Sequence, residues 1–320
     1  MDTPSLLRVQ SMAWQTPQVL SIVLQSPDGQ ALPEAEPGSH VDLHLGQGLS
    51  RSYSVVGHAG SESCYEIAVA KDANSRGGSR FVHEKLRVGD LVATSAPRNL
   101  FPLHAAGRFH VLIAGGIGIT PIWAMVQRLE ALGTPWELHF AARSRRDAAY
   151  LNRIESLAQR SCCGRLVTHF DDENSGIPPD LGAIVNAAPP GTHFYCCGPQ
   201  GMLKAYEKAT ASVPPDHVHL ERFAAEAPTG AAAAFQVQLA RSGMQLTIPP
   251  DRTILDVLLE HGINAPYGCM QGSCGMCETA VIDGTPAHGD MLLSDEEKAK
   301  NDKLLICCSR SLSPVLTLDL

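Results

Sequence analysis

The loop Cys269-Met270-Gln271-Gly272-Ser273-Cys274-Gly275-Met276-Cys277 holds three cysteines, separated by four and then two residues. A fourth cysteine, Cys307, follows after 29 intervening residues. This C-x4-C-x2-C…C spacing is the plant-type pattern of [2Fe–2S] ligands, in which one tight loop supplies three of the four thiolates. The small residues of the loop let backbone N–H groups face the sulfur atoms. The spacing therefore predicts an iron–sulfur domain near the end of the sequence.

The cysteines leave two alternatives open. A structural zinc site fits the pattern poorly, because zinc ligands usually come as two close pairs rather than three residues and one distant partner. Spacing alone does not decide between Cys307 and Cys308 as the fourth ligand. We expect four further cysteines to be small core residues with no special chemistry: Cys64, Cys162, Cys163 and Cys196.

The residues around the cysteine loop predict a third domain at 235–320. Phe235–Leu239 alternates apolar and polar residues, and a second strand is expected near Gln245–Ile248. A helix is expected over about Thr253–Glu260, with Gly262 as its cap, and the sequence 294–297 forms a capping-box pattern. An Ala-rich stretch with Pro228 and Gly230 precedes this domain, and we expect a linker at 227–234.

The middle of the chain alternates strands and helices. Phe109–Ala114 is a continuous apolar run, typical of a parallel strand buried on both faces. We expect helices over Pro121–Leu132 and Ala148–Ala158, and strands over Trp136–Ala142, Arg165–Phe170 and Phe194–Cys197. This alternation predicts a doubly wound α/β domain at 106–226.

Two motifs follow strands of this domain. The loop 114–121 reads Ala-Gly-Gly-Ile-Gly-Ile-Thr-Pro, and a helix N-terminus behind such glycines can hold a dinucleotide pyrophosphate. A glycine turn needed only for packing is the alternative. Cys197-Gly198-Pro199 follows another strand, at the sheet edge where ligands bind in open α/β sheets. A plain Gly-Pro turn is the alternative there.

The first 105 residues are rich in short strands. Strands are expected over Val19–Leu24, Val41–Leu45, Arg51–Val56 and Tyr65–Ala70, with a short helix near Ser79–Leu86. This spacing predicts an antiparallel β-barrel at 1–105. Arg51-Ser52-Tyr53-Ser54 lies in one strand, and Arg76-Gly77-Gly78-Ser79 precedes the helix as a candidate anion pocket. A polar strand face and a solvated turn are the respective alternatives.

Composition excludes several classes of protein. The chain has 320 residues and a net charge of −8, with 5% aromatic residues, which disfavours nucleic-acid binding. No apolar run approaches 18 residues and the N-terminus lacks the pattern of a signal peptide. We therefore expect a cytoplasmic protein with reduced thiols, no membrane association and a monomeric state.

Taken together and in order, these motifs resemble those of the phthalate dioxygenase reductase family. The resemblance covers essentially the whole chain. It implies a flavin-binding β-barrel and an NAD-binding α/β domain of ferredoxin-reductase type, followed by a plant-type ferredoxin domain of β-grasp fold. It implies FMN, a [2Fe–2S] cluster and NADH as cofactors.

The resemblance also assigns residues. Ser54, Cys197 and Phe223 are expected at the reacting rings: Ser54 near the flavin N5, Cys197 near the nicotinamide and Phe223 covering the flavin. The cofactor-binding residues are expected to be Arg51 and Tyr53 at the flavin ring, Arg76, Gly77, Gly78 and Ser79 at the FMN phosphate, Gly115, Gly116, Gly118 and Thr120 at the pyrophosphate, and Gly198 and Pro199 beside Cys197. The cluster ligands are expected to be Cys269, Cys274, Cys277 and Cys307.

The implied function is the transfer of electrons from NADH through FMN and the cluster to a terminal Rieske-type aromatic oxygenase or demethylase. A hydride carries two electrons and the cluster takes one, so a group between them must accept a pair and release single electrons, which FMN does. A cytochrome P450 as acceptor is one alternative, and a non-enzymatic module with a structural cluster is another. Arg143, Arg145 and Arg146 could hold a 2′-phosphate and favour NADPH, whereas the resemblance favours NADH.

Overall fold

The computed structural model describes residues 4–46, 49–73, 75, 77–223, 233–268, 270, 272, 274–290 and 292–320. The chain forms two compact units, one of residues 1–45 and 53–222 and one of residues 46–52 and 223–320. The predicted boundary near residue 105 lies inside the first unit, which contains both a barrel and a parallel sheet. Most of the predicted linker, 227–232, lies outside the described residues.

The first part of the chain is a closed antiparallel barrel. Its sheet has the order β4-β5-β2-β1-β6-β3-β7, and an additional pairing of β4 with β3 closes it. Strands β2, β3 and β5 are buried along almost their whole length, and their apolar side chains give the barrel its own core. A short helix, α1 (Gly78–Glu84), lies where the sequence predicts it. The strands are β1 (Ser5–Thr16), β2 (Val19–Gln25), β3 (Ser39–His44), β4 (Ser50–Gly57), β5 (Cys64–Ala70), β6 (Leu91–Thr94) and β7 (Arg98–Asn99).

A five-stranded parallel sheet follows, with the order β10-β9-β8-β11-β12. The direction of winding reverses between β8 and β11, and this switch point is where open α/β sheets bind ligands. The strands are β8 (Phe109–Gly115), β9 (Trp136–Ala142), β10 (Gly164–Phe170), β11 (Thr192–Cys197) and β12 (Val218–Glu221). The doubly wound fold is therefore confirmed, and β12 is an additional edge strand that the sequence analysis did not include.

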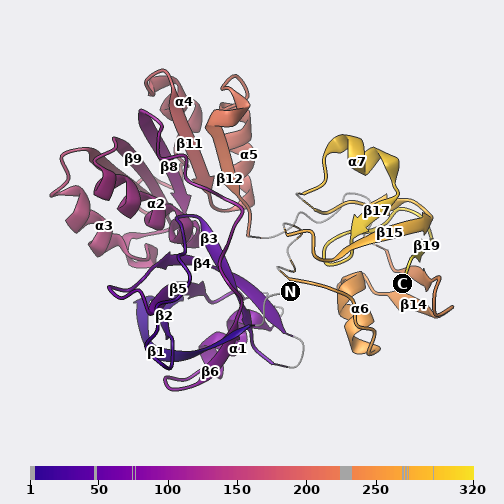
Figure 1. Ribbon diagram of the computed structural model, residues 1–320. Helices are drawn as coiled ribbons and strands as arrows, with labels where there is room; N and C mark the ends of the chain where they lie inside the picture. Colours follow the sequence, from indigo (N-terminus) through magenta and orange to yellow (C-terminus); the bar gives the residue numbers. More distant parts are fainter. Residues whose placement is uncertain are drawn as a thin grey trace. The chain divides into compact units, whose positions relative to one another are not determined.

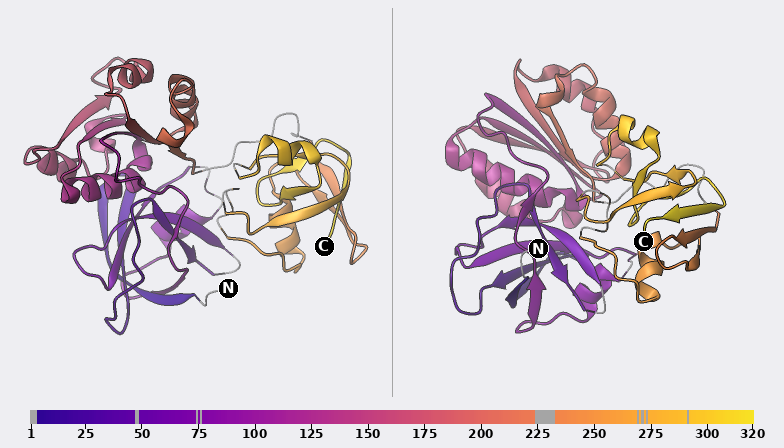
Figure 2. Two further views of the ribbon diagram at one scale, coloured as in Figure 1. Left: turned by 45° about the horizontal axis from the view of Figure 1, so that its top comes forward. Right: turned by 45° about the vertical axis from the view of Figure 1, so that its right-hand side comes forward.

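Helices cover both faces of this sheet, with α2 and α3 on one side and α4 and α5 on the other (Figure 1, Figure 2). Helix α2 (Ile119–Leu132) begins two residues before the predicted start. Helix α3 (Leu151–Ala158) begins three residues later than predicted, because Tyr150 before it adopts a left-handed conformation with φ of 62°. The chain also forms α4 (Leu181–Ala187), α5 (Gln200–Ala209) and three short 3-10 turns, η1 (Gly116–Gly118), η2 (Arg145–Asp147) and η3 (Pro215–His217).

The second unit has a mixed five-stranded sheet of order β14-β13-β19-β15-β17 and a two-stranded sheet of β16 and β18. The predicted strands β13 (Phe235–Leu239) and β14 (Gln245–Ile248) are confirmed residue for residue. Both predicted helix starts are confirmed by capping boxes, at Thr253 before α6 (Ile254–Glu260) and at Ser294 before α7 (Asp295–Lys300). The remaining strands are β15 (Glu278–Asp283), β16 (Pro286–Ala287), β17 (Lys303–Leu305), β18 (Arg310–Ser311) and β19 (Val315–Leu318).

Candidate functional site

The glycine loop and the Cys197-Gly198-Pro199 turn lie against each other at the carboxyl ends of β8 and β11. These strands are neighbours in the sheet, with Ala114 paired to Cys197. A Cβ atom placed on Gly118 would lie 2.1 Å from the carbonyl oxygen of Cys197. The two motifs therefore form one continuous surface across the switch point.

The glycines of this surface fall into two groups, those that close packing requires and one that faces open space. A Cβ on Gly115 would lie 2.6 Å from Pro199 Cδ, and one on Gly198 would lie 2.8 Å from Met202 Sδ, so these positions need glycine for close packing. Gly116 has a φ of +53° and a Cβ there would meet nothing within 4 Å. Gly116 thus faces open space, which is where the backbone could approach a phosphate. Close packing therefore accounts for Gly115 and Gly198, whereas Gly116 is not required by packing and stays a predicted phosphate-binding residue.

Thr120 lies in the first turn of α2 and is buried. Its hydroxyl donates to the carbonyl oxygen of Ile117 at 3.0 Å. That bond stabilises the turn that leads into the helix and still leaves the oxygen lone pairs available. The loop consequently presents backbone N–H groups, and the N-terminal end of the 14-residue α2, toward the switch point.

Cys197 is fully buried at the end of β11, beside Glu221 at the end of β12. The Cys197 Sγ lies 3.9 Å from Glu221 Oε2. Burial raises the pKa of the Cys197 thiol well above its usual value, and the nearby Glu221 charge adds to this. Burial likewise raises the pKa of Glu221 to about 8. At neutral pH the pair is therefore a neutral thiol facing a mostly protonated carboxyl group.

Sequence reasoning missed Glu221, although it lies two residues before Phe223, which was singled out. The missing information is the register of β12, which places Glu221 directly opposite Cys197. Phe223 follows the end of β12 and is half-buried. Between them, Arg222 forms an ion pair with Glu207 of α5 at 2.5 Å.

Strand β4 carries three of the predicted flavin residues. Ser54 is buried, whereas Arg51 and Tyr53 are half-buried. The same strand is tied to the glycine-loop helix, because Gln127 Nε2 of α2 donates to the Val56 carbonyl at 3.1 Å. The strand expected to line the flavin is thus fixed to the helix expected to face the dinucleotide.

The predicted phosphate pocket precedes α1. Gly77 has a φ of +97° at the N-cap, a conformation that favours glycine. Ser79 accepts a hydrogen bond from the backbone N–H of Asp72 at 3.2 Å, so its hydroxyl proton remains to be donated. Gly78 is buried within the first turn. Arg76 lies outside the described residues.

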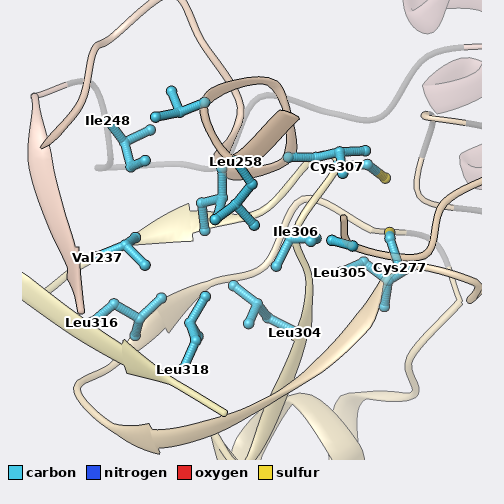
Figure 3. Packing of buried hydrophobic residues seen from close by; sticks show 14 of the residues in the cluster. Val237, Ile248, Leu258, Cys277, Leu304, Leu305, Ile306, Cys307, Leu316 and Leu318 are labelled. Carbon is cyan, nitrogen blue, oxygen red and sulfur yellow. The ribbon is translucent and has the colours of Figure 1, made fainter. Parts of the chain in front are cut away.

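Three of the four predicted cluster ligands are described. Cys277 and Cys307 are buried, Cys274 is half-buried, and Cys269 lies outside the described residues. Figure 3 shows Cys277 and Cys307 at one margin of the apolar core, with both sulfur atoms directed away from the aliphatic side chains. Within the described part of the chain, no group of three or more His, Cys, Asp or Glu side chains is arranged to hold a metal ion. The four-thiolate set requires Cys269.

The neighbouring cysteine, Cys308, lies behind the ligand loop. A Cβ on Gly272, whose φ is +77°, would lie 2.6 Å from Cys308 Sγ. Cys308 Sγ also lies 3.7 Å from the carbonyl oxygen of Leu305. Gly272 is therefore required both by its backbone conformation and by the sulfur atom behind it.

A second polar group occupies the opposite, amino end of the parallel sheet. His110, His193 and His219 are each the second residue of their strands, β8, β11 and β12. His193 Nδ1 lies 3.2 Å from His219 Nε2, with the two rings nearly parallel at 8°. His104 stacks on His219 at 4.7 Å between ring centroids, and His217 stacks on His193 at 4.3 Å. We call these five residues the histidine edge.

Family models match both candidate sites. Residues 237–312 match a 2Fe-2S iron-sulfur cluster binding domain, and residues 112–208 match an oxidoreductase NAD-binding domain. In the structure, the first range contains the cysteine loop and the second contains the glycine loop and Cys197. No helix in the described residues has the length and apolar character needed to cross a membrane.

Whole-chain comparisons agree with these matches. The chain is 46% identical over 318 residues to the phenoxybenzoate dioxygenase subunit beta of Ectopseudomonas oleovorans, covering 99% of this chain and 98% of the relative. It is 48% identical over 303 residues to a tetrachlorobenzoquinone reductase of Sphingobium chlorophenolicum, covering 94% and 93%. Its fold matches a solved phthalate dioxygenase reductase, described as modular for electron transfer from pyridine nucleotides to [2Fe-2S], with a TM-score of 0.81, 33% identity and coverage of 98% and 97%.

Proposed function

The chain belongs to the phthalate dioxygenase reductase family, and on this premise we propose that it is the NADH-dependent reductase component of a two-component aromatic oxygenase or demethylase. Electrons would pass from NADH through FMN and a [2Fe–2S] cluster to a terminal Rieske-type oxygenase. The observation that carries the proposal is the meeting of the glycine loop with Cys197 at the switch point, in a chain that also holds the plant-type cysteine pattern.

The barrel residues are suited to holding FMN. Arg51, Tyr53 and Ser54 would lie along the isoalloxazine, and the phosphate would bind Gly77, Gly78 and Ser79 together with Arg76. When bound, FMN accepts an electron pair from the nicotinamide and releases electrons singly. Phe223 would cover the flavin. The protein's own task here is to orient the two rings and exclude water.

The switch point is suited to holding NADH. Gly116 and the N-terminus of α2 would face the pyrophosphate, with Gly115, Gly118 and Thr120 shaping the loop. Cys197, Gly198 and Pro199 would border the nicotinamide. Because burial favours the neutral forms of Cys197 and Glu221, the pair places little charge beside the ring at pH 7. This suits a hydride transfer, in which no side chain needs to act as a strong acid or base.

The choice between NADH and NADPH depends on the arginines after β9. Arg145 forms an ion pair with Glu155 at 2.5 Å and lies 5.5 Å from the Phe170 ring centroid. The Glu155 carboxylate partly neutralises this exposed guanidinium and makes it a weaker partner for a 2′-phosphate. Arg143 and Arg146 are exposed. The existing partner of Arg145 supports NADH.

The second unit is suited to holding the cluster through Cys269, Cys274, Cys277 and Cys307. Plant-type clusters have low potentials, about −400 mV, and can reduce a Rieske centre at about −150 to +300 mV. The net charge of −8 favours attraction to a basic face of the acceptor.

We also propose three domains: a flavin domain at 1–105, a nucleotide domain at 106–226 and a ferredoxin domain at 235–320, with a linker at 227–234. We further propose a cytoplasmic location and a monomeric state.

A comparison of two electron acceptors tests this proposal. The holoprotein is mixed anaerobically with NADH and either a purified Rieske oxygenase component or tetrachlorobenzoquinone, the acceptor class named for one relative. We expect reduction of the Rieske centre, at a rate that falls as ionic strength rises. Cys277→Ser should abolish that reduction and leave NADH bleaching of the flavin intact. Reduction of the quinone with none of the Rieske centre would favour a quinone reductase and contradict the proposal.

A further inference from the structure

The second unit holds a buried carboxylate, Asp290, whose Cα and Cβ lie close to Gly272 of the ligand loop. The Asp290 side chain is fully buried, between β16 and α7. Its Oδ1 accepts hydrogen bonds from the backbone N–H groups of Leu292 at 3.2 Å and Leu293 at 2.8 Å. The carboxylate therefore fixes the turn that leads into α7.

Two basic side chains surround this carboxylate. Lys298 Nζ of α7 donates to the Asp290 carbonyl oxygen at 3.0 Å and lies 3.9 Å from Oδ1. His288 Nδ1 lies 3.5 Å from Oδ2. Neither Oδ2 nor either ring nitrogen of His288 has a hydrogen-bond partner among the described residues. A buried carboxylate is costly unless basic groups or hydrogen-bond donors surround it, and here Lys298, His288 and two backbone N–H groups do so.

Asp290 contacts the segments that carry the proposed ligands. A Cβ on Gly272, between Cys269 and Cys274, would lie 3.0 Å from Asp290 Cα. The same position is 2.6 Å from Cys308 Sγ, next to Cys307. The backbone N–H of Gly289 also donates to Ser309 Oγ at 3.3 Å, which joins the turn to the segment after Cys307.

We propose that Asp290 is a positioning residue for the cluster, which holds the ligand loop and the Cys307 segment in place and lowers the cluster's reduction potential by its negative charge. Groups outside the ligands orient metal-binding side chains, and net charge near a cluster sets its potential. A carboxylate disfavours the added electron of the reduced cluster, whereas the ammonium of Lys298 favours it. This inference rests on the proposed function, because it needs a bound cluster.

Two substitutions with opposite charge effects test the inference in the holoprotein. Asp290→Asn should raise the midpoint potential measured by redox titration with EPR detection, and Lys298→Met should lower it. Asp290→Asn should also speed loss of the visible cluster absorbance in the presence of a chelator by about tenfold. Asp295→Asn, on the exposed first turn of α7, removes the same charge away from the loop and should change neither quantity.

The outcomes separate this inference from the proposed function. Potentials that do not differ from the Asp295→Asn control, or that shift in the same direction in both variants, overturn the role of Asp290. If Asp290→Asn does not retain its cluster, Asp290→Glu decides: it keeps the negative charge and should hold the wild-type potential, and a raised potential in that variant overturns the charge role. A wild-type protein that binds no cluster would instead overturn the proposed function itself.

Discussion

The two ends of strands β8, β11 and β12 differ in the kind of side chain they carry. The carboxyl ends bear glycines, Cys197 and Glu221, with backbone groups facing the switch point. The amino ends bear or adjoin the stacked imidazoles of the histidine edge, with His193 four residues before Cys197 on β11 and His219 two residues before Glu221 on β12. A short segment of β11 and β12 thus connects a candidate nucleotide site to the histidine edge.

Burial acts on these two ends in opposite ways. It raises the pKa of Glu221 to about 8, and it lowers the pKa of His219 to about 4, with smaller contributions from His104, His193 and His217. Asp216 acts in the other direction on His219, and Tyr195 stacks on its ring. The pKa values of His110 and His193 are lowered as well, again mainly by burial. Burial therefore disfavours the charged forms of Glu221, His110, His193 and His219, and base and acid should weaken different ends of the sheet.

The largest expected effect comes from Gly118→Ala. The new Cβ would meet the Cys197 carbonyl at 2.1 Å and force the two loops apart, and a misplacement near 1 Å can slow a positioned reaction by about 100-fold. Stopped-flow reduction of the flavin by NADH measures this. Gly201→Ala on α5 is the matched control, because its Cβ would meet nothing within 4 Å. A Gly118→Ala protein as fast as this control would contradict the packed-loop arrangement.

Glu221→Gln tests the carboxyl end. Because the folded-state pKa of about 8 lies above the value of an unfolded glutamate, the neutral form stabilises the fold at low pH and this contribution is lost as pH rises from about 4.5 to 8. Glutamine should come closest to the wild type near pH 4.5 and should become increasingly more stable than the wild type as pH rises toward 9, with about 2–4 °C in Tm for each kcal/mol of difference. Thermal melts of holoprotein check this, with the exposed Glu62→Gln as control. If the Tm of the variant and that of the wild type differ more at pH 6 than at pH 9, the raised pKa assigned to Glu221 is contradicted.

His219→Gln tests the amino end, with the opposite sign. The folded-state pKa of about 4 lies below that of an unfolded histidine, so the stabilising contribution is present above pH 6.5 and is lost as pH falls toward 4. The variant should lose less Tm than the wild type between pH 7 and 4.5, by about 2–4 °C. His44→Gln, at an exposed barrel position, should show the wild-type pH dependence. If the Tm of His219→Gln falls with decreasing pH as steeply as that of the wild type, protonation of His219 does not destabilise the fold.

The smallest expected effect is that of Arg145→Gln on nucleotide choice. Because Glu155 already pairs with this guanidinium, the ratio of NADH to NADPH turnover should change by less than about twofold. Steady-state rates with both nucleotides measure it, with the exposed Arg143→Gln for comparison. A several-fold rise in NADH preference would show that Arg145 reaches a 2′-phosphate.

Much of the fold could be predicted from local sequence. The bounds of β9, β13 and β14, and the capping boxes of α6 and α7, follow from patterns within a few residues. The glycine motifs at the switch point could be recognised as well, because they too are local patterns. The different duties of Gly116 and Gly118 could not be predicted, because they depend on which atoms of the other loop lie within reach.

Two features could be predicted only with the strand pairing of the folded sheet: the pairing of Glu221 with Cys197, and the histidine edge. Glu221 becomes a neighbour of Cys197 only through the parallel pairing of β11 with β12, strands separated by α5 and η3. The histidines are scattered from residue 104 to residue 219, and no local pattern joins them. Asp290 is similar, because its contact with Gly272 crosses the second unit.

The most direct test of the account is an anaerobic titration of the holoprotein with NADH, followed by visible absorbance and EPR. We expect flavin and [2Fe–2S] absorbance to bleach together, with the EPR signal of a reduced cluster, and we expect Gly118→Ala to slow both changes equally. Bleaching of neither chromophore, or of the flavin without the cluster, would contradict electron transfer from the switch point through the flavin to the cysteine loop.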